Sequence, residues 1–110
     1  MAVSTDPAAR QVPVCARAEL SPGEVRVVPG AEPIAVFCAD DGEVYALADS
    51  CTHQRTPLSD GWVEGTHVEC PLHESCFDLR TGEPLGPPAT VPVRTYPVVE
   101  VDGIVHVVLG

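Results

Sequence analysis

The sequence predicts an all-β protein of one domain. Valine dominates its apolar residues, and 12 prolines and 9 glycines interrupt the 110-residue chain. This composition disfavours long helices and favours short strands joined by turns. Short apolar segments also recur along the chain, with clusters of Gly, Pro, Asp and Ser between them, which is typical of antiparallel sheets.

The apolar segments give the expected strands in chain order, with one helical turn between the first two. This turn is expected over Ala16–Leu20, before a Ser-Pro-Gly turn, and a helix of greater length is not predicted anywhere. Strands are expected over Val12–Ala16, Val25–Pro29, Ile34–Ala39, Val44–Ala48, Thr66–Cys70, Cys76–Leu79, part of Val91–Val101, and Ile104–Leu109.

The first predicted hairpin turns at Asp41-Gly42, because both residue types tolerate a positive φ. A two-residue turn there pairs Cys38 with Tyr45 and places one set of apolar side chains on a common face. That face would comprise Ile34, Val36, Cys38, Tyr45 and Leu47. It predicts a buried and chemically inert Cys38.

The second predicted hairpin turns at Asp102-Gly103 and pairs Val101 with Ile104 and Val99 with His106. Both faces of this hairpin are apolar, so the pattern does not select the one that faces the core.

The middle of the chain has shorter strands and denser turns, with four prolines between Glu83 and Pro92. This predicts a small ligand-bearing subdomain, at about residues 49–89, inserted into an antiparallel β-sandwich. We expect a single domain over residues 11–110 and a loose tail over residues 1–10. Trp62 is expected to pack under the ligand loops.

The charge and the cysteine count limit the class of protein. With 16 acidic and 6 basic residues, the net charge is −10, which argues against nucleic acid and anionic membranes as partners. Five cysteines are an odd number, the N-terminus lacks the pattern of a signal peptide, and the apolar segments are too short to span a bilayer. We therefore expect a cytoplasmic protein with reduced cysteines.

Two cysteine-histidine pairs carry the chemistry: Cys51 with His53, and Cys70 with His73. Thiolates and imidazoles together suit a tetrahedral zinc ion, or a [2Fe–2S] cluster with two cysteines on one iron and two histidines on the other. Zinc sites usually pair their ligands two to four residues apart, often as Cys-x₂-Cys. The mixed and unequal spacing here favours the cluster.

The segment around these pairs resembles a Rieske [2Fe–2S] ferredoxin, and especially the ferredoxin components of bacterial ring-hydroxylating dioxygenase systems. The residues that carry the resemblance are Cys51 and His53, the Leu58–Gly61 segment, and the run from Glu69 to Gly82. The resemblance implies that Cys51 and Cys70 hold a buried iron, and that His53 and His73 hold an outer iron at the tip of the protein.

The same resemblance indicates which residues surround the cluster. High-potential relatives carry a disulfide beside the cluster, but its two positions are occupied here by Thr56 and Leu72. Those relatives also have a serine and a tyrosine that donate to sulfur, where this chain has Ser75 and Phe77. Pro88 belongs to a run that resembles the proline loop covering the cluster, although such a run can also be a stiff connector.

Two charged residues near the expected tip are candidates for partner docking. Arg55 follows His53 by two residues, and Glu74 stands directly after His73, where the family usually has glycine.

The resemblance implies a one-electron carrier that takes electrons from a flavin reductase and passes them to a terminal oxygenase in aromatic catabolism. It implies an electron-transfer component rather than an enzyme, because the chain has no catalytic constellation of its own. Two alternatives are a small Rieske subunit of another oxidoreductase, similar to those of nitrite reductases, and a zinc-stabilised interaction module.

The surroundings of the cluster predict its reduction potential. Hydrogen-bond donors and net charge set Rieske potentials over about −150 to +300 mV. With no loop disulfide, Phe77 in place of a hydroxyl donor, and an acidic chain, an added electron is poorly compensated. Redox titration followed by visible absorbance should give a midpoint below zero, and a midpoint well above zero would contradict this prediction.

Overall fold

The computed structural model describes residues 10–51, 56–71, 75–86 and 89–109, which form three antiparallel sheets. Sheet A has the order β1 (Gln11–Ala16), β10 (Ile104–Val108), β9 (Val98–Val101). Sheet B has the order β2 (Val25–Val28), β3 (Ile34–Cys38), β4 (Val44–Ala48), β8 (Thr95–Tyr96). Sheet C has the order β5 (Trp62–Glu64), β6 (His67–Glu69), β7 (Cys76–Asp78). The helical elements of the described residues are two short 3-10 turns, Arg17–Glu19 and Leu58–Asp60, so the all-β prediction is confirmed.

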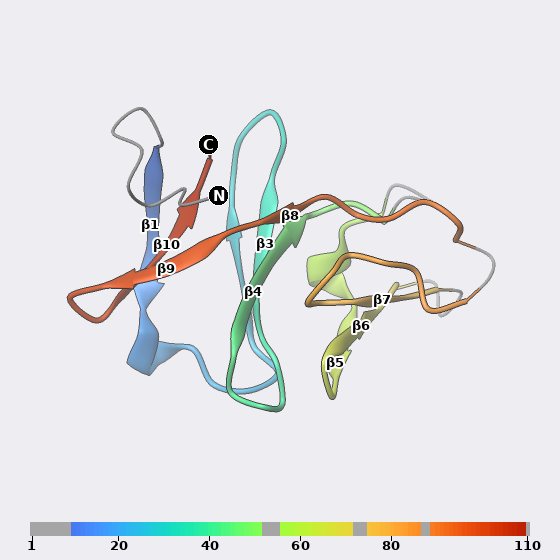
Figure 1. Ribbon diagram of the computed structural model, residues 1–110, viewed down its shortest axis with the longest axis horizontal. Coiled ribbons are helices and arrows are strands. Elements are labelled where there is room, and N and C mark those ends of the chain that lie inside the picture. The colour runs from blue at the N-terminus through green and yellow to red at the C-terminus, as the bar shows by residue number, and fades with distance from the viewer. Residues whose placement is uncertain (1–9, 52–55, 72–74, 87–88, 110) are drawn as a thin grey trace.

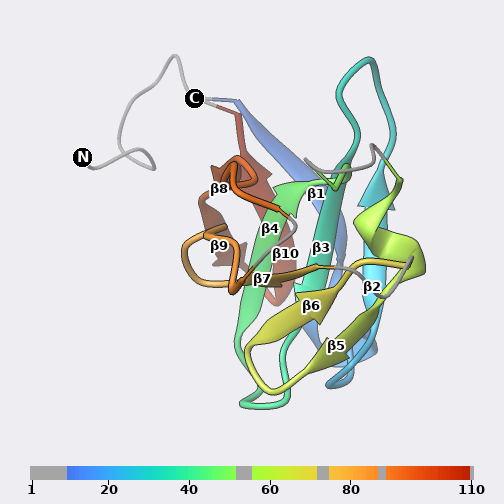
Figure 2. The same ribbon diagram turned by 90° about the vertical axis from the view of Figure 1, so that its right-hand side faces the viewer.

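The three sheets form layers, with sheet B in the middle (Figures 1 and 2). Sheet A covers one face of sheet B, and sheet C lies on the other side of it. Sheet C is formed by the chain between β4 and β8, which are themselves neighbours in sheet B. The predicted insertion of a small unit into a β-sandwich is therefore present. Its predicted bounds, 49–89, stay a prediction.

The core between sheets A and B, called here the base core, is aliphatic. Its buried members come from β3, β4, β10 and the segments beside them: Leu20, Ile34, Val36, Cys38, Ala46, Tyr96, Val105 and Val107. Burial raises the pKa of the Cys38 thiol. The prediction that Cys38 is buried is confirmed, and the raised pKa keeps the thiol protonated and unreactive.

The core between sheets B and C, called here the loop-side core, lies on the opposite face of the same strands. It includes Ala35, Phe37, Ala39, Leu47, Cys51, Leu58, Val68, Cys70, Phe77, Leu79, Ala89 and Val93. Two of the predicted metal ligands are therefore part of a continuous packed core, and the sheets fix their positions.

The predicted register of the first hairpin is wrong by one residue. Cys38 pairs with Val44 rather than with Tyr45. The Ala39 N–H donates to the Glu43 carbonyl, the Gly42 N–H donates to the Ala39 carbonyl, and Gly42 has a φ of 87°. The turn is thus a type I turn followed by a glycine bulge, one residue longer than the predicted turn.

The change of register splits the predicted apolar face. Ile34, Val36 and Cys38 face the base core, whereas Tyr45 and Leu47 belong to the loop-side core. The physical reason is that side chains alternate along a strand, so a shift of one residue moves the partner strand's side chains to the other face.

The second hairpin has the predicted register, with Val101 opposite Ile104 and Val99 opposite His106. Asp102 and Gly103 have φ values of 52° and 78°, as a two-residue type I′ turn requires. The fold also selects the inward face that the sequence left open: Val105 and Val107 point into the base core.

Strand β5 was not predicted, because its three residues lie between two turn signals. The expectation that Trp62 packs under the ligand loops is also wrong, since its side chain is 49% exposed. Alternation along β5 accounts for this, because Val63 takes the inward position against the loop-side core and Trp62 points outward.

Candidate metal centre

Each predicted cysteine ligand begins a short loop that leaves a strand. Cys51 follows β4, and its N–H donates to the Thr56 carbonyl at 2.8 Å. Cys70 follows β6, and its N–H donates to the Ser75 carbonyl at 2.7 Å. In both loops the bond joins the cysteine to the residue five positions later. The two loops are therefore closed at the base in the same way.

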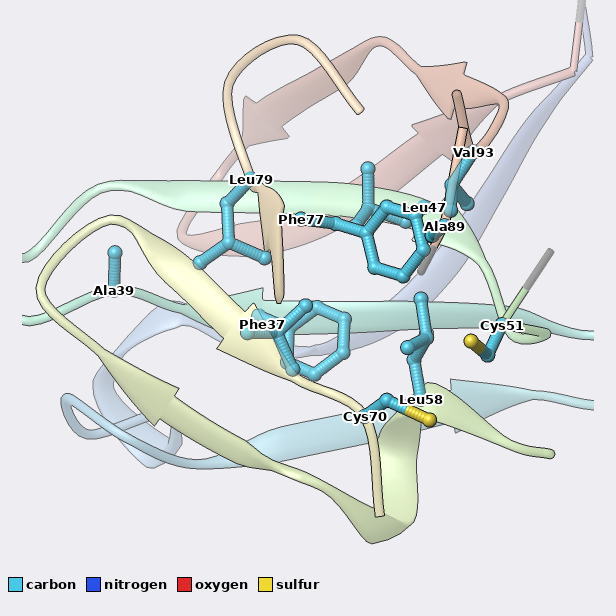
Figure 3. Packing of buried hydrophobic residues seen from close by; sticks show 12 residues of the cluster. Phe37, Ala39, Leu47, Cys51, Leu58, Cys70, Phe77, Leu79, Ala89 and Val93 are labelled. Carbon is cyan, nitrogen blue, oxygen red and sulfur yellow. The ribbon is translucent and has the colours of Figure 1, made fainter. Parts of the chain in front are cut away.

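Both cysteines are completely buried, with exposed fractions of 0%. Their side chains lie toward the same end of the loop-side core, both close to Leu58 in the view of Figure 3. All five cysteines lie within the described residues, and none of them forms a disulfide. A buried pair of thiols on two loops is a suitable sulfur donor set for a metal centre enclosed by protein.

Five of the predicted site residues lie outside the described residues. They are His53, Arg55, His73, Glu74 and Pro88. Within the described ranges, no group of three or more Cys, His, Asp or Glu side chains could hold a metal ion. The structure therefore places the two predicted cysteine ligands, while the ligand role of these cysteines and of the two histidines stays a prediction.

Asp49 connects the two ends of the first loop. Its carboxylate accepts from the Ser59 N–H through Oδ1 and from the Ser59 hydroxyl through Oδ2, both at 2.7 Å. Asp49 lies just before the loop and Ser59 just after it. The carboxylate thus fixes both ends of the segment that begins with Cys51, a role that the sequence analysis missed.

Ser75, a predicted neighbour of the cluster, is buried, with only 4% exposed. Its hydroxyl oxygen accepts from the Ala89 N–H at 3.2 Å, which connects the second loop to the end of the proline-rich run. Because that bond uses an oxygen lone pair, the hydroxyl proton stays free to donate. Pro88 lies outside the described residues, and its predicted role stays a prediction.

Phe77 is fully buried in the loop-side core, opposite Val68 and bridged to Pro84. The neighbouring thiol, Cys76, is half-buried. Burial, followed by the charge of Glu69, raises the pKa of Cys76. Cys76 therefore favours the protonated thiol, and the expectation from its sequence position that it is not a ligand stays a prediction.

Thr56, which occupies one of the two disulfide positions of the high-potential relatives, makes a contact that the sequence did not predict. Its hydroxyl oxygen lies 3.5 Å from the Cys70 sulfur. A sequence signal exists for it, because Thr56 follows Cys51 by the same five residues by which Ser75 follows Cys70. The two loops thus share a cysteine at the start and a hydroxyl residue at the closing position.

Gly61 allows the two loops to approach each other. A Cβ at this position would lie 2.0 Å from the carbonyl oxygen of Glu69, the residue directly before Cys70. Since the obstacle is backbone, no side-chain rotation could relieve the contact. The absence of a side chain at Gly61 therefore sets the position of Cys70.

A family model described as the Rieske [2Fe-2S] domain matches residues 10–97, and the chain belongs to this family. Cys51 and Cys70 are fully buried, form no disulfide and stand on loops closed in the same way, so they fit such a group. Its cofactor is a Rieske-type [2Fe–2S] cluster, as the resemblance implied.

The relatives are ferredoxin components. The chain is 44% identical to the 3-phenylpropionate/cinnamic acid dioxygenase ferredoxin subunit of Photorhabdus laumondii, over 91% of this chain and 95% of that protein. It is 51% identical to the anthranilate 1,2-dioxygenase ferredoxin subunit of Burkholderia cepacia, over 76% of each. The prediction of a ferredoxin-type electron carrier, rather than an enzyme, is confirmed.

Solved structures agree with this fold. A ferredoxin in a complex of reduced oxygenase and oxidised ferredoxin of carbazole 1,9a-dioxygenase superposes with a TM-score of 0.81 at 40% identity, covering 87% of this chain and 99% of that one. A candidate NADH-dependent nitrite reductase small subunit from Mycobacterium tuberculosis also gives 0.81, but at 26% identity, covering 93% of this chain and 96% of that one.

The position of Gly61 gives a testable prediction. Gly61→Ala should destabilise the protein by about 1–3 kcal/mol, as overpacking generally does, and should lower the iron bound per chain because it displaces Glu69 and Cys70. Thermal unfolding and iron analysis of the purified protein measure both effects.

Gly23→Ala is the control for this experiment. Gly23 has a φ of 88° and open space around the position of a Cβ, so this change adds backbone strain of about 1–2 kcal/mol without a clash. It should leave iron loading unchanged. Equal iron contents in the two variants would contradict the role assigned to Gly61.

Proposed function

We propose that this chain is the ferredoxin of a multicomponent ring-hydroxylating dioxygenase system. It accepts one electron at a time from a flavin-dependent reductase and delivers it to a terminal oxygenase. The observation that carries the proposal is the match to a dioxygenase ferredoxin subunit over nearly the whole of both chains. The structure adds support, because the ferredoxin it superposes on was solved in complex with an oxygenase.

We infer the ligand set from the two loops. Cys51 and Cys70 hold the inner iron, and His53 and His73 hold the outer iron. When bound, the cluster supplies a reversible one-electron step. The protein residues hold it in place: Asp49 and Ser59 join the ends of the first loop, and the Ser75–Ala89 bond connects the second loop to the proline-rich run.

The charge of the chain indicates how partners are recognised. A net charge of −10 without any lysine favours docking on basic protein surfaces and makes association sensitive to salt. Electron-transfer encounters are usually weak and small. Arg55 and Glu74, next to the proposed histidine ligands in sequence, are the proposed docking residues at the tip.

The cell compartment that fits this role is the cytoplasm, where flavin reductases work with reduced nicotinamide cofactors. The absence of a disulfide at all five cysteines is consistent with it. Among the described residues, no helix has both the length and the apolar character needed to cross a membrane.

A second candidate is the small subunit of a nitrite-reductase-like enzyme, favoured by the TM-score of 0.81 to such a protein. The two roles differ in the acceptor of the electron. A reduced sample that transfers electrons to a nitrite reductase large subunit, but not to a ring-hydroxylating oxygenase, would favour the second role.

The proposed cysteine ligands can be tested individually. Cys51→Ser and Cys70→Ser should each abolish the reddish-brown colour and the electron paramagnetic resonance signal of the reduced cluster. Cys76→Ser removes a neighbouring thiol that is not a proposed ligand, and it should keep both signals and wild-type iron content. Full iron loading in either of the first two variants would remove that cysteine from the ligand set.

The proposed electron path can be tested by reconstitution. Product formation by a ring-hydroxylating terminal oxygenase should require this protein together with NADH and a flavin reductase. Arg55→Glu should slow the transfer, by a factor that shrinks as salt is added, because Arg55 is proposed to pair with an acidic group of the partner that lies within the otherwise basic docking surface, and a glutamate would repel that group.

Arg26→Glu makes the same charge change on β2, where the guanidinium contacts the Val25 and Glu19 carbonyls. It should have a smaller effect at every salt concentration. Equal rates for Arg55→Glu and wild type would exclude Arg55 from docking. The proposed function would be overturned if the protein supported turnover by none of the ring-hydroxylating oxygenases tested.

A further inference from the structure

Thr56 connects the two cysteine loops. Its carbonyl accepts the Cys51 N–H within the first loop, while its side-chain hydroxyl lies 3.5 Å from the sulfur of Cys70 in the second loop. One residue thus contacts the backbone of one proposed ligand and the sulfur of the other. Its position is fixed, because the backbone bond to Cys51 holds the residue that carries the hydroxyl.

The chemistry of a metal ligand decides the direction of this contact. In the free protein, either the thiol or the hydroxyl can be the donor. A cysteine that binds iron does so as a thiolate and has no proton to give. In the loaded protein the Thr56 hydroxyl must therefore donate and the Cys70 sulfur must accept.

The surroundings strengthen this hydrogen bond. The Cys70 side chain is fully buried and Thr56 is half-buried, so water competes weakly for the hydroxyl proton. A donor to a ligand sulfur stabilises negative charge, and a one-electron reduction adds negative charge to the centre. Such a donor favours the reduced state and raises the reduction potential.

We propose that Thr56 tunes the reduction potential of this ferredoxin by donating a hydrogen bond from its hydroxyl to the Cys70 thiolate. The proposal rests on the proposed ligand role of Cys70. Thr56 acts as a positioning and tuning residue, separate from Ser75, whose hydroxyl accepts from Ala89.

The test compares variants at position 56 in the loaded protein. Thr56→Val keeps the shape and removes the hydroxyl, whereas Thr56→Ser keeps the hydroxyl. Thr56→Val should favour the oxidised state by about three- to tenfold, as expected for the loss of one hydrogen bond, which is about 30 to 60 mV at 59 mV per tenfold. Thr56→Ser should recover most of this shift.

The control is Thr66→Val, which makes the same change at another half-buried threonine. Thr66 precedes β6 and Cys70 follows it, so the two residues lie at opposite ends of this strand. It should leave the potential unchanged.

A second readout is the iron–thiolate stretching band in resonance Raman spectra, which should respond to deuterium exchange less in Thr56→Val than in wild type. If Thr56→Val loads poorly, Thr56→Ala provides the same comparison with a smaller side chain.

The outcomes separate this proposal from the ligand assignment. Loss of cluster in Cys70→Ser tests the ligand, whereas a potential shift at full iron content tests Thr56. An unchanged or raised potential in Thr56→Val would overturn the proposal. So would an equal fall in Thr56→Val and Thr56→Ser, which would indicate a packing effect instead of a hydrogen bond.

Discussion

The arrangement of the site depends on the backbone hydrogen bonds that close the two cysteine loops. In each loop the N–H of the cysteine donates to a carbonyl five residues later: Cys51 to Thr56, and Cys70 to Ser75. Because the bond fixes both ends of a short segment, the cysteine stays in the buried core where the strand ends. Both proposed histidine ligands lie between these ends in the sequence. Asp49 joins the two ends of the first loop, Gly61 allows the two loops to approach each other, and the Ser75–Ala89 bond connects the second loop to the proline-rich run.

The layered fold supplies the rigidity that this arrangement needs. Sheet B is covered by sheet A on one face and sheet C on the other (Figure 1), so the strands that lead into both cysteines are packed against neighbours. A buried, preorganised environment limits how far the surroundings rearrange when charge changes, which suits a one-electron carrier. The same burial makes each polar contact to sulfur more influential, because water screens it weakly. This is why a single hydroxyl at position 56 can matter for the potential.

The position of Thr56 in the fold affects the expected reduction potential. From sequence, Thr56 marks only the absence of a loop cysteine, and Phe77 marks the loss of a hydroxyl donor. In the fold, Thr56 lies within hydrogen-bond distance of the Cys70 sulfur, so this position lacks the loop cysteine but carries a hydroxyl donor. The midpoint is still expected below zero, because the chain is acidic and Phe77 cannot donate, but Thr56 partly offsets that effect.

The sequence by itself determined the all-β class, the two cysteine-histidine pairs and the register of the second hairpin. These features depend on composition or on residues close together in the chain, such as Asp102-Gly103, whose positive φ values match a two-residue turn. The tertiary structure decided the register of the first hairpin, where Asp41-Gly42 was compatible with turns of two lengths and packing on both faces of β3 selected the longer one. It also decided the outward position of Trp62 and the contact between Thr56 and Cys70, which are 14 residues apart. Local preferences do not determine such contacts, because they depend on how separate loops and sheets pack together.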